Sequence, residues 1–108
     1  MLPRRNRIVE PGDFRSVVRR GDKCVTNHLI GYRIGAGEPR VGIIITSKCG
    51  NAVVRNSLRR RTRAIARELI DNGKLGGDVV IRFRCEGQTP SFEQLRGELT
   101  ECAERWSG

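Results

Sequence analysis

The chain has 108 residues, and its 21 lysines and arginines outnumber its 12 aspartates and glutamates, which gives a formal charge of +9. This excess favours nucleic acid or an anionic membrane surface over a neutral small molecule as the partner. No apolar run approaches the ~20 residues that a membrane-spanning helix needs, and no apolar stretch follows the basic N-terminus as in a secretion signal. We therefore expect one domain over residues 1–108, cytoplasmic and without a membrane span.

Alternation of apolar and polar residues, together with turn-forming residues, predicts the secondary structure. We expect a basic extended arm over residues 1–11, a helix over 13–20, strands over 28–34 and 40–47, a helix over 52–71, a strand over 78–85 and a helix from residue 92 onward, with a further short strand near 24–27 left open. The last helix begins at a Ser-x-x-Gln capping box formed by Ser91 and Gln94. This order is typical of an α+β fold, a small two-layer sandwich with three helices on one side of the sheet and the other side partly open.

The helix predicted over residues 52–71 carries the most informative pattern. Between Arg55 and Arg67 it holds six arginines in thirteen residues and no acidic residue. At about 100° per residue, basic side chains gather on one face and apolar side chains on the opposite face. The basic face consists of Arg55, Asn56, Arg59, Arg60, Arg63 and Arg67. Because clustered guanidinium groups repel one another and bind phosphate in a bidentate manner, this face predicts a nucleic-acid surface.

The kind of nucleic acid is only partly fixed by this charge pattern. The strands predicted on both sides of the helix argue against a helix-turn-helix reader of DNA. Asn56 is equally consistent with an RNA contact and with a capping role near the helix start. Phe14 and Tyr32 lie near basic residues and are candidates for stacking on unpaired bases, although core packing is the stronger alternative for Phe14. The remaining aromatic side chains fit the apolar stripes of a core: Phe83, Phe92 and Trp106.

No catalytic or metal-binding constellation is evident. The chain has one histidine, His28, and scattered acidic residues, so we predict no catalytic residue and no bound metal. The four cysteines are widely spaced, which favours reduced, partly buried thiols: Cys24, Cys49, Cys85 and Cys102. Their even number permits a disulfide, but no pairing is favoured. If the protein takes part in a reaction, a partner must supply the catalytic groups.

Several segments, taken in order, resemble the protein subunit of bacterial ribonuclease P. Residues 52–63, Ala-Val-Val-Arg-Asn-Ser-Leu-Arg-Arg-Arg-Thr-Arg, resemble the Arg-Asn-Arg motif helix of that family. Residues 2–8, 13–21, 40–48, 77–82 and 91–95 are similar to the family in order and spacing, so the resemblance covers nearly the whole chain.

The resemblance implies a left-handed β-α-β crossover, against the general preference for right-handed ones. It also implies a role in the ribonucleoprotein endonuclease that removes the 5′ leader of precursor tRNA. In such an enzyme the RNA subunit holds the catalytic Mg²⁺ and the protein binds no cofactor itself. The implied partners are ribonuclease P RNA and precursor tRNA, with no DNA. Carried over by position, the basic face would contact the catalytic RNA, and a cleft for the single-stranded leader would contain Phe14, Tyr32 and Lys48.

The chain departs from the family pattern at three places. Ser57 replaces an arginine, the connection Lys48-Cys49-Gly50 is one residue short, and Val18 stands where an aromatic side chain is common. The alternative function is that of a plain RNA-binding module, such as a ribosomal protein or an RNA chaperone. Such a module would bind RNA without stimulating the processing of precursor tRNA.

Overall fold

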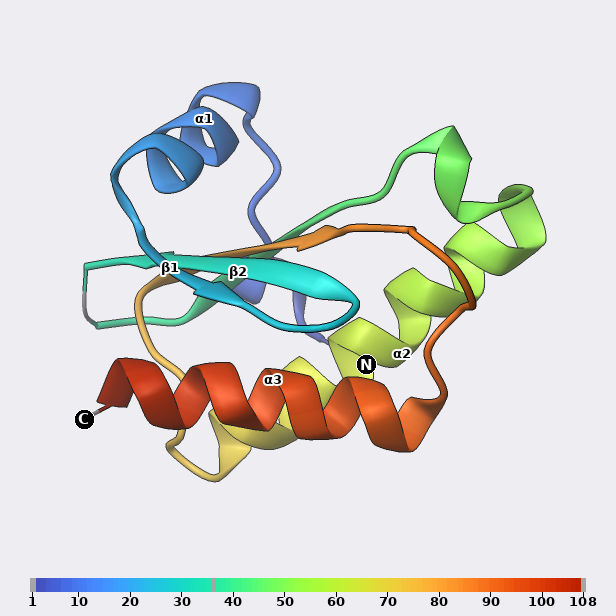
Figure 1. Ribbon diagram of the computed structural model, residues 1–108. Helices are drawn as coiled ribbons and strands as arrows, with labels where there is room; N and C mark the ends of the chain where they lie inside the picture. The colour runs from blue at the N-terminus through green and yellow to red at the C-terminus, as the bar shows by residue number, and fades with distance from the viewer. Residues whose placement is uncertain (1, 36, 108) are drawn as a thin grey trace.

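The computed structural model describes residues 2–35 and 37–107 and has an α+β architecture (Figure 1). In chain order it contains the 3₁₀ helix η1 (Arg4–Asn6), α1 (Pro11–Arg20), β1 (Asp22–Val25), β2 (Leu29–Ile34), β3 (Arg40–Ile44), the 3₁₀ helix η2 (Ser47–Cys49), α2 (Ala52–Asp71), β4 (Asp78–Phe83) and α3 (Phe92–Ser107). The predicted helices and strands are confirmed to within a few residues at their ends. The short strand that was left open is β1.

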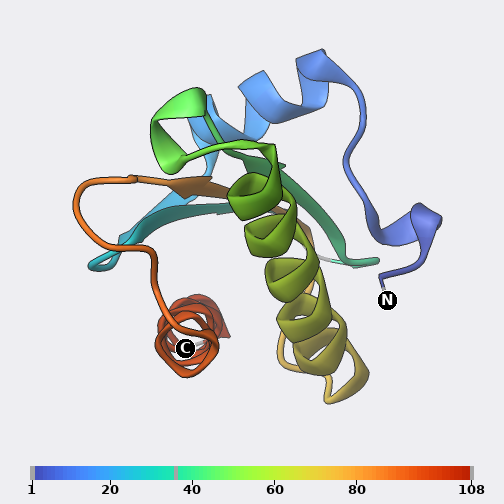
Figure 2. The ribbon, with the colours of Figure 1, turned by 90° about the vertical axis from the view of Figure 1, so that its right-hand side faces the viewer.

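The strands of the described residues form a four-stranded mixed sheet in the order β1-β2-β4-β3. β1 pairs antiparallel with β2, and β2 pairs antiparallel with β4, whereas β3 runs parallel to β4. Between these parallel neighbours the chain passes beneath the sheet as α2. Figures 1 and 2 together show that this crossover is left-handed, as the resemblance implies.

The helices lie on both sides of the sheet. α2 and α3 pack beneath one face, and α1 covers part of the opposite face (Figure 1). We expected all three helices on one side, and this expectation is wrong for α1. The apolar stripe of α1, formed by Phe14, Val17 and Val18, identifies the side of the helix that is buried. It carries no information about which face of the sheet receives that side.

Two hydrophobic groups follow from this arrangement. The larger group lies between the sheet and α2 with α3, and it includes Leu29, Leu58, Ile65, Ile81, Phe83 and Leu95. Phe92 and Trp106 pack against it, so the three aromatics predicted for the core are confirmed there. The smaller group lies between the sheet and α1, and it consists of Ile8, Val17, Tyr32 and Val80. Strand alternation explains the division, because successive residues of β4 point to opposite faces of the sheet.

The N-terminal segment is docked on the domain and is not a free extended arm. Leu2 is buried in the larger hydrophobic group. Asn6 Nδ2 donates a hydrogen bond to Pro39 O at 2.7 Å, and Ile8 N donates to Val41 O at 3.0 Å. Arg7 forms a parallel bridge with Val41. Residues 7–8 therefore lie along the outer edge of β3.

Side-chain caps fix the starts of the two long helices. At the start of α2, Asn51 Oδ1 accepts a hydrogen bond from Val54 N at 3.0 Å, directly after Gly50 has turned the chain with φ of 123°. At the start of α3, Ser91 Oγ accepts from Gln94 N at 3.1 Å, and Gln94 Oε1 accepts from Ser91 N at 2.9 Å. The predicted capping box is thus confirmed.

A carboxylate on α3 holds the turn between β1 and β2. Glu98 Oε1 accepts hydrogen bonds from Thr26 Oγ1 at 2.5 Å and from His28 N at 2.8 Å, and Glu98 Oε2 lies 2.6 Å from His28 Nδ1. Burial raises the pKa of Glu98, but the hydrogen bonds from Thr26 and His28 together lower it by more, so the net shift is downward. The only histidine of the chain therefore has a structural partner.

The cysteines divide into one disulfide and two buried thiols. Cys49, the last residue of η2, is bonded to Cys85, which follows β4, with their Cα atoms 4.9 Å apart. Cys24 and Cys102 are free and lie in the larger hydrophobic group. The expectation of reduced thiols is therefore wrong for the first pair. Sequence spacing could not reveal it, because the β3-α2-β4 crossover brings together residues 36 positions apart.

Candidate nucleic-acid interface

α2 separates its two faces as the sequence predicts. Leu58, Ile65 and Leu69 are buried in the larger hydrophobic group. On the other side, Asn56 and Arg60 are exposed, and the rest of the basic face is partly exposed: Arg55, Arg59, Arg63 and Arg67. Packing of one face therefore fixes the positions from which the arginine side chains project on the other face.

The basic face has almost no acidic partners. Arg67 forms an ion pair with Asp71 at 3.2 Å. Within the part of the chain that the structure describes, the other cations of this face form no ion pair with a carboxylate: Arg55, Arg59, Arg60 and Arg63. Asn56 Oδ1 accepts a hydrogen bond from Arg59 Nη1 at 3.3 Å. Asn56 thus orients a guanidinium group and does not cap the helix, since Asn51 is the N-cap.

Positive charge on this surface extends beyond α2. The pKa of Arg63 is lowered, first by burial and then by the positive charges of Arg7 and Arg59. Arg7 comes from the docked N-terminal segment, so that segment contributes a guanidinium group beside the basic face. The sequence shows that residues 1–11 are rich in arginine. It contains no signal that places Arg7 next to α2.

A groove opens on the face of the sheet that α1 leaves partly uncovered. One side is formed by the connection from β3 to α2, where Lys48 is exposed, and the other by β1, β2 and the end of β4. We call this feature the basic groove. Its lining includes Lys23, Ile30, Ser47, Lys48, Arg82 and Arg84, and also Glu86, whose carboxylate forms an ion pair with Arg84 at 3.5 Å.

Of the cations in the basic groove, only Lys48 is a site residue predicted from the sequence. Strand register explains the other positions, because Lys23 pairs with Tyr32 and Arg82 pairs with Ile30 across the sheet. These side chains therefore share one face. A single lysine or arginine in a strand is too common to mark a binding site, so no sequence signal distinguished them.

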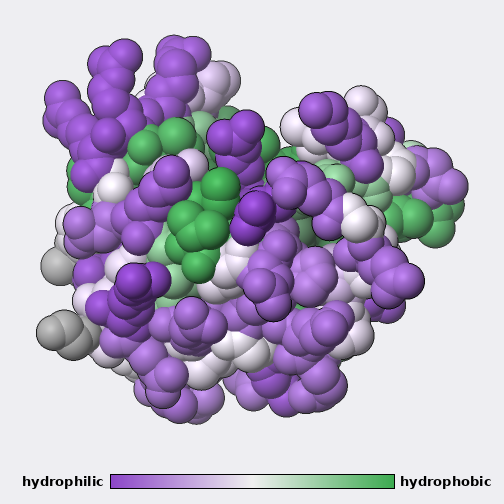
Figure 3. Space-filling model, in the orientation of Figure 1, coloured by the Kyte–Doolittle hydropathy of each residue, from purple (hydrophilic) through white to green (hydrophobic). Residues whose placement is uncertain are grey.

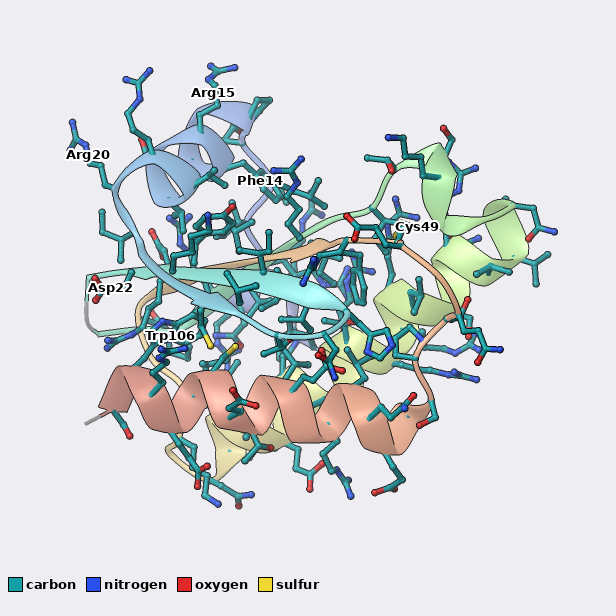
Figure 4. All side chains as sticks on the ribbon, viewed as in Figure 1. Phe14, Arg15, Arg20, Asp22, Cys49 and Trp106 are labelled. Carbon is teal, nitrogen blue, oxygen red and sulfur yellow. A yellow bond between two sulfur atoms is a disulfide. The ribbon has the colours of Figure 1, made fainter. Side chains whose placement is uncertain are left out.

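The two aromatic candidates differ in their exposure. Phe14 is partly exposed, and its ring lies over Gly42, where an added Cβ would be 2.7 Å from Phe14 Cζ. Figure 4 shows Phe14 on the side of α1 nearer the sheet, whereas Arg15 and Arg20 point outward. Tyr32, by contrast, is 6% exposed and lies beneath α1 in the smaller hydrophobic group. The structure therefore leaves the ring of Phe14, and not that of Tyr32, accessible from the surface.

The surface view agrees with this division of charged and apolar side chains. In Figure 3, hydrophilic side chains stand on α1 at the upper left, and apolar surface lies directly below them. The surface is hollowed between α1 and the segment that leads into α2. A second small hollow lies between α1 and β3, beside Phe14.

Neither a metal centre nor a membrane span is found in the described residues. Among residues 2–35 and 37–107, no three His, Cys, Asp or Glu side chains are grouped so that they could hold a metal ion. No helix in the same part of the chain is long and apolar enough to cross a membrane.

A left-handed crossover helix with an arginine face, next to a sheet with a basic groove, defines a small α+β protein that binds nucleic acid. A family model described as Ribonuclease P matches residues 2–107. The chain therefore belongs to the ribonuclease P protein family.

Relatives and solved structures are similar over nearly the whole chain. The ribonuclease P protein component of Clavibacter michiganensis subsp. michiganensis is 33% identical over 108 residues, which covers 97% of this chain and 96% of that protein. The corresponding component from Mycobacterium tuberculosis is 37% identical over 101 residues, covering 92% and 87%. The solved RNase P protein from Thermotoga maritima has a TM-score of 0.76 and 26% identity, and the match covers 92% of this chain and 96% of that one. These similarities disfavour the ribosomal-protein alternative.

Proposed function

We propose that this chain is the protein component of a ribonuclease P that removes the 5′ leader of precursor tRNA. In this role it binds two RNAs, the catalytic RNA through the basic face and the leader through the basic groove and Phe14. The observation that carries the proposal is that Arg55, Arg59, Arg60 and Arg63 of α2 form no ion pair with a carboxylate within the described residues, in a chain of this family.

The basic face is suited to the folded backbone of the catalytic RNA. Arg55, Arg59 and Arg63 recur every fourth residue, about 6 Å apart along the helix axis. Each planar guanidinium group can donate two hydrogen bonds to one phosphate. Because the opposite face of α2 is packed, the backbone that carries the row is already fixed before RNA binds, which lowers the entropy cost of binding. Arg7 adds a further cation at the edge of this row.

The basic groove is suited to a single strand. Proteins that bind single strands without reading their sequence combine stacking on aromatic rings with cations along the backbone. Phe14 supplies a partly exposed ring, and Lys48 and Arg82 supply cations. We assign Tyr32 a supporting role, since its buried ring packs under α1 and helps to hold Phe14 in place.

The cutting itself belongs, in this proposal, to the RNA subunit, which holds the catalytic Mg²⁺. The chain binds and orients both RNAs, and its arginines neutralise phosphates that otherwise need metal counterions. The protein should therefore lower the Mg²⁺ concentration required for cleavage. We place this activity in the cytoplasm, with the precursor tRNA.

Reconstitution tests the proposal. The purified chain is combined with the catalytic RNA of the same organism and a precursor tRNA with a long 5′ leader, and cleavage is measured at low and at high Mg²⁺. We expect stimulation at low Mg²⁺ and tighter binding of the long-leader substrate than of one with a single leader nucleotide. A ribosomal protein of similar charge is the control. A folded chain that fails to stimulate cleavage at low Mg²⁺ would rule the function out.

A further inference from the structure

We propose that the Cys49–Cys85 disulfide is a reversible modification site that controls the basic groove. In the oxidised form it holds the two sides of the groove together for single-stranded RNA, and in the reduced form it releases one side. This inference rests on the proposed function of the groove as the binding site for the leader.

The disulfide joins the two sides of the groove. Cys49 directly follows Lys48 in the connection to α2, and Cys85 directly follows Arg84 at the end of β4. Lys48 and Arg84 line the groove from opposite sides. Each end of the covalent link is therefore one residue away from a groove cation. Figure 4 shows Cys49 where the segment leading to α2 passes the end of β4.

The segment that carries Lys48 has few other attachments. Cys49 N donates a hydrogen bond to Thr46 O at 3.0 Å, and Gly50 N donates to Ser47 O at 3.3 Å. In the described part of the chain, the hydrogen bonds of residues 46–51 all stay within residues 46–55, and none reaches β4. The disulfide is thus the tie that fixes this segment to the sheet. Without it, the side of the groove that carries Lys48 is held mainly by the packing of Cys49 and by α2.

The disulfide lies near the surface on its Cys85 side, where that residue is partly exposed. It borders a pocket that is open to solvent and is also lined by His28, Lys48 and Pro90. Cys85 is partly exposed and has φ of 52°, a left-handed conformation that non-glycine residues rarely adopt. The free thiols of the chain are buried, so they are not comparable sites.

The reaction is thiol–disulfide exchange with a dithiol reductant. A thiolate of the reductant attacks the sulfur of Cys85, the bond between Cys85 and Cys49 breaks, and Cys49 leaves with the electron pair and takes up a proton. The second thiol of the reductant then displaces Cys85, which is also protonated. The protein gains two electrons and two protons, and the reductant becomes a disulfide. Glutathione disulfide reverses the process by the same exchange, and is itself reduced to two glutathione thiols.

The expected effect follows from preorganisation. A groove that is already closed to its binding width does not have to order its exposed segment when RNA binds. Ordering one side chain, such as that of Lys48, lowers affinity by about two- to twelvefold. Reduction should therefore weaken the binding of the leader by about this factor and leave binding through the basic face of α2 unchanged.

The experiment uses the holoenzyme with its catalytic RNA. The protein is either oxidised with glutathione disulfide or reduced with dithiothreitol, and its thiols are counted by alkylation and mass measurement. Four cysteines with one disulfide give two free thiols before reduction and four after it. Kd is then measured for a precursor tRNA with a long leader and for one with a single leader nucleotide. The control variant C49S/C85S should behave as the reduced protein and should not respond to dithiothreitol.

Each outcome decides between the possibilities. The proposal is supported if reduction weakens binding of the long-leader substrate alone and if C49S/C85S binds that substrate weakly whether or not dithiothreitol is present. Equal affinity for the long-leader substrate in both redox states overturns the proposed redox control, but it does not contradict the proposed leader site. If the oxidised protein does not distinguish the two substrates, the proposed leader site is wrong. If reduction weakens binding of both substrates and circular dichroism shows unfolding, the disulfide is only a structural link and the modification site is refuted.

Discussion

Replacing Arg59 and Arg63 together by alanine tests the basic face of α2 directly. Neither side chain forms an ion pair with a carboxylate within the described residues, and Arg63 is close enough to Arg7 and Arg59 for their charges to lower its pKa. Removing both guanidinium groups therefore breaks no ion pair and relieves repulsion between like charges. We expect the free energy of unfolding to stay the same or to rise slightly. Any loss of RNA binding is then attributable to lost contacts.

The size of the effect follows from the salt dependence of RNA binding. Each phosphate neutralised by a cation contributes about 0.7 to 0.9 to the slope of log K against log salt, so two contacts contribute about 1.4 to 1.8. Between 50 and 200 mM salt, a fourfold change, this slope corresponds to about a 7- to 12-fold change in affinity. The unmodified protein should lose that much more affinity over this range than the double variant.

The assay is a filter-binding or fluorescence titration of the catalytic RNA at several salt concentrations. The matched control is Lys74→Ala with Arg96→Ala, which also removes two positive charges but places the change in the α2–β4 connection and on α3. Arg96 pairs with Glu68 at 2.7 Å, so a thermal melt accompanies the control. If the slopes of the unmodified protein and the Arg59/Arg63 variant coincide, or if the control lowers the slope equally, the basic face is not the RNA-binding surface.

Three further results are expected. Gly42→Ala should lower stability by about 1–3 kcal/mol in a denaturant titration, because the added Cβ meets the ring of Phe14; unchanged stability would mean that α1 shifts freely. The depressed pKa of Glu98 means that its hydrogen bonds with Thr26 and His28 stabilise the fold above the ordinary carboxyl range, and that this stability is lost as pH falls through the folded pKa. Glu98→Gln should flatten that acid-side loss, and an identical pH profile would contradict the assignment. Reducing the disulfide should lower the unfolding free energy by about 4 kcal/mol for a 36-residue separation, measured by urea titration with and without dithiothreitol.

The parts of the structure that were predictable from sequence are those set by local chemistry. The bounds of α2 follow from its apolar spacing and the Asn72-Gly73 stop, and the start of α3 follows from a capping box whose two hydrogen bonds are local. The basic face was predictable because helix geometry alone brings residues four apart together. This prediction did not depend on knowing which elements α2 packs against.

The parts that were not predictable depend on contacts between distant segments. The stripe of α1 could pack on either face of the sheet, and its actual position is what buries Tyr32. The placement of Arg7 beside α2 depends on a bridge between the N-terminal segment and β3. The disulfide requires the parallel pairing of β3 with β4, which places the segments that follow both strands at the same end of the sheet. In each case the local sequence is compatible with several partners, and the tertiary packing selects one.

The docking of residues 7–8 along β3 also affects how the molecule avoids self-association. A terminal strand with free N–H and C=O groups is a template for pairing with a second molecule. Here the hydrogen bond from Ile8 to Val41 occupies part of that template, and burial of Leu2 anchors the covering segment. A proteolytic cut just before α1 would release this covering segment. The edge of β3 would then be exposed for pairing with another molecule, despite the high net charge of the domain. Residues 7–8 thus cover part of a sheet edge that would otherwise be open to pairing with a second molecule.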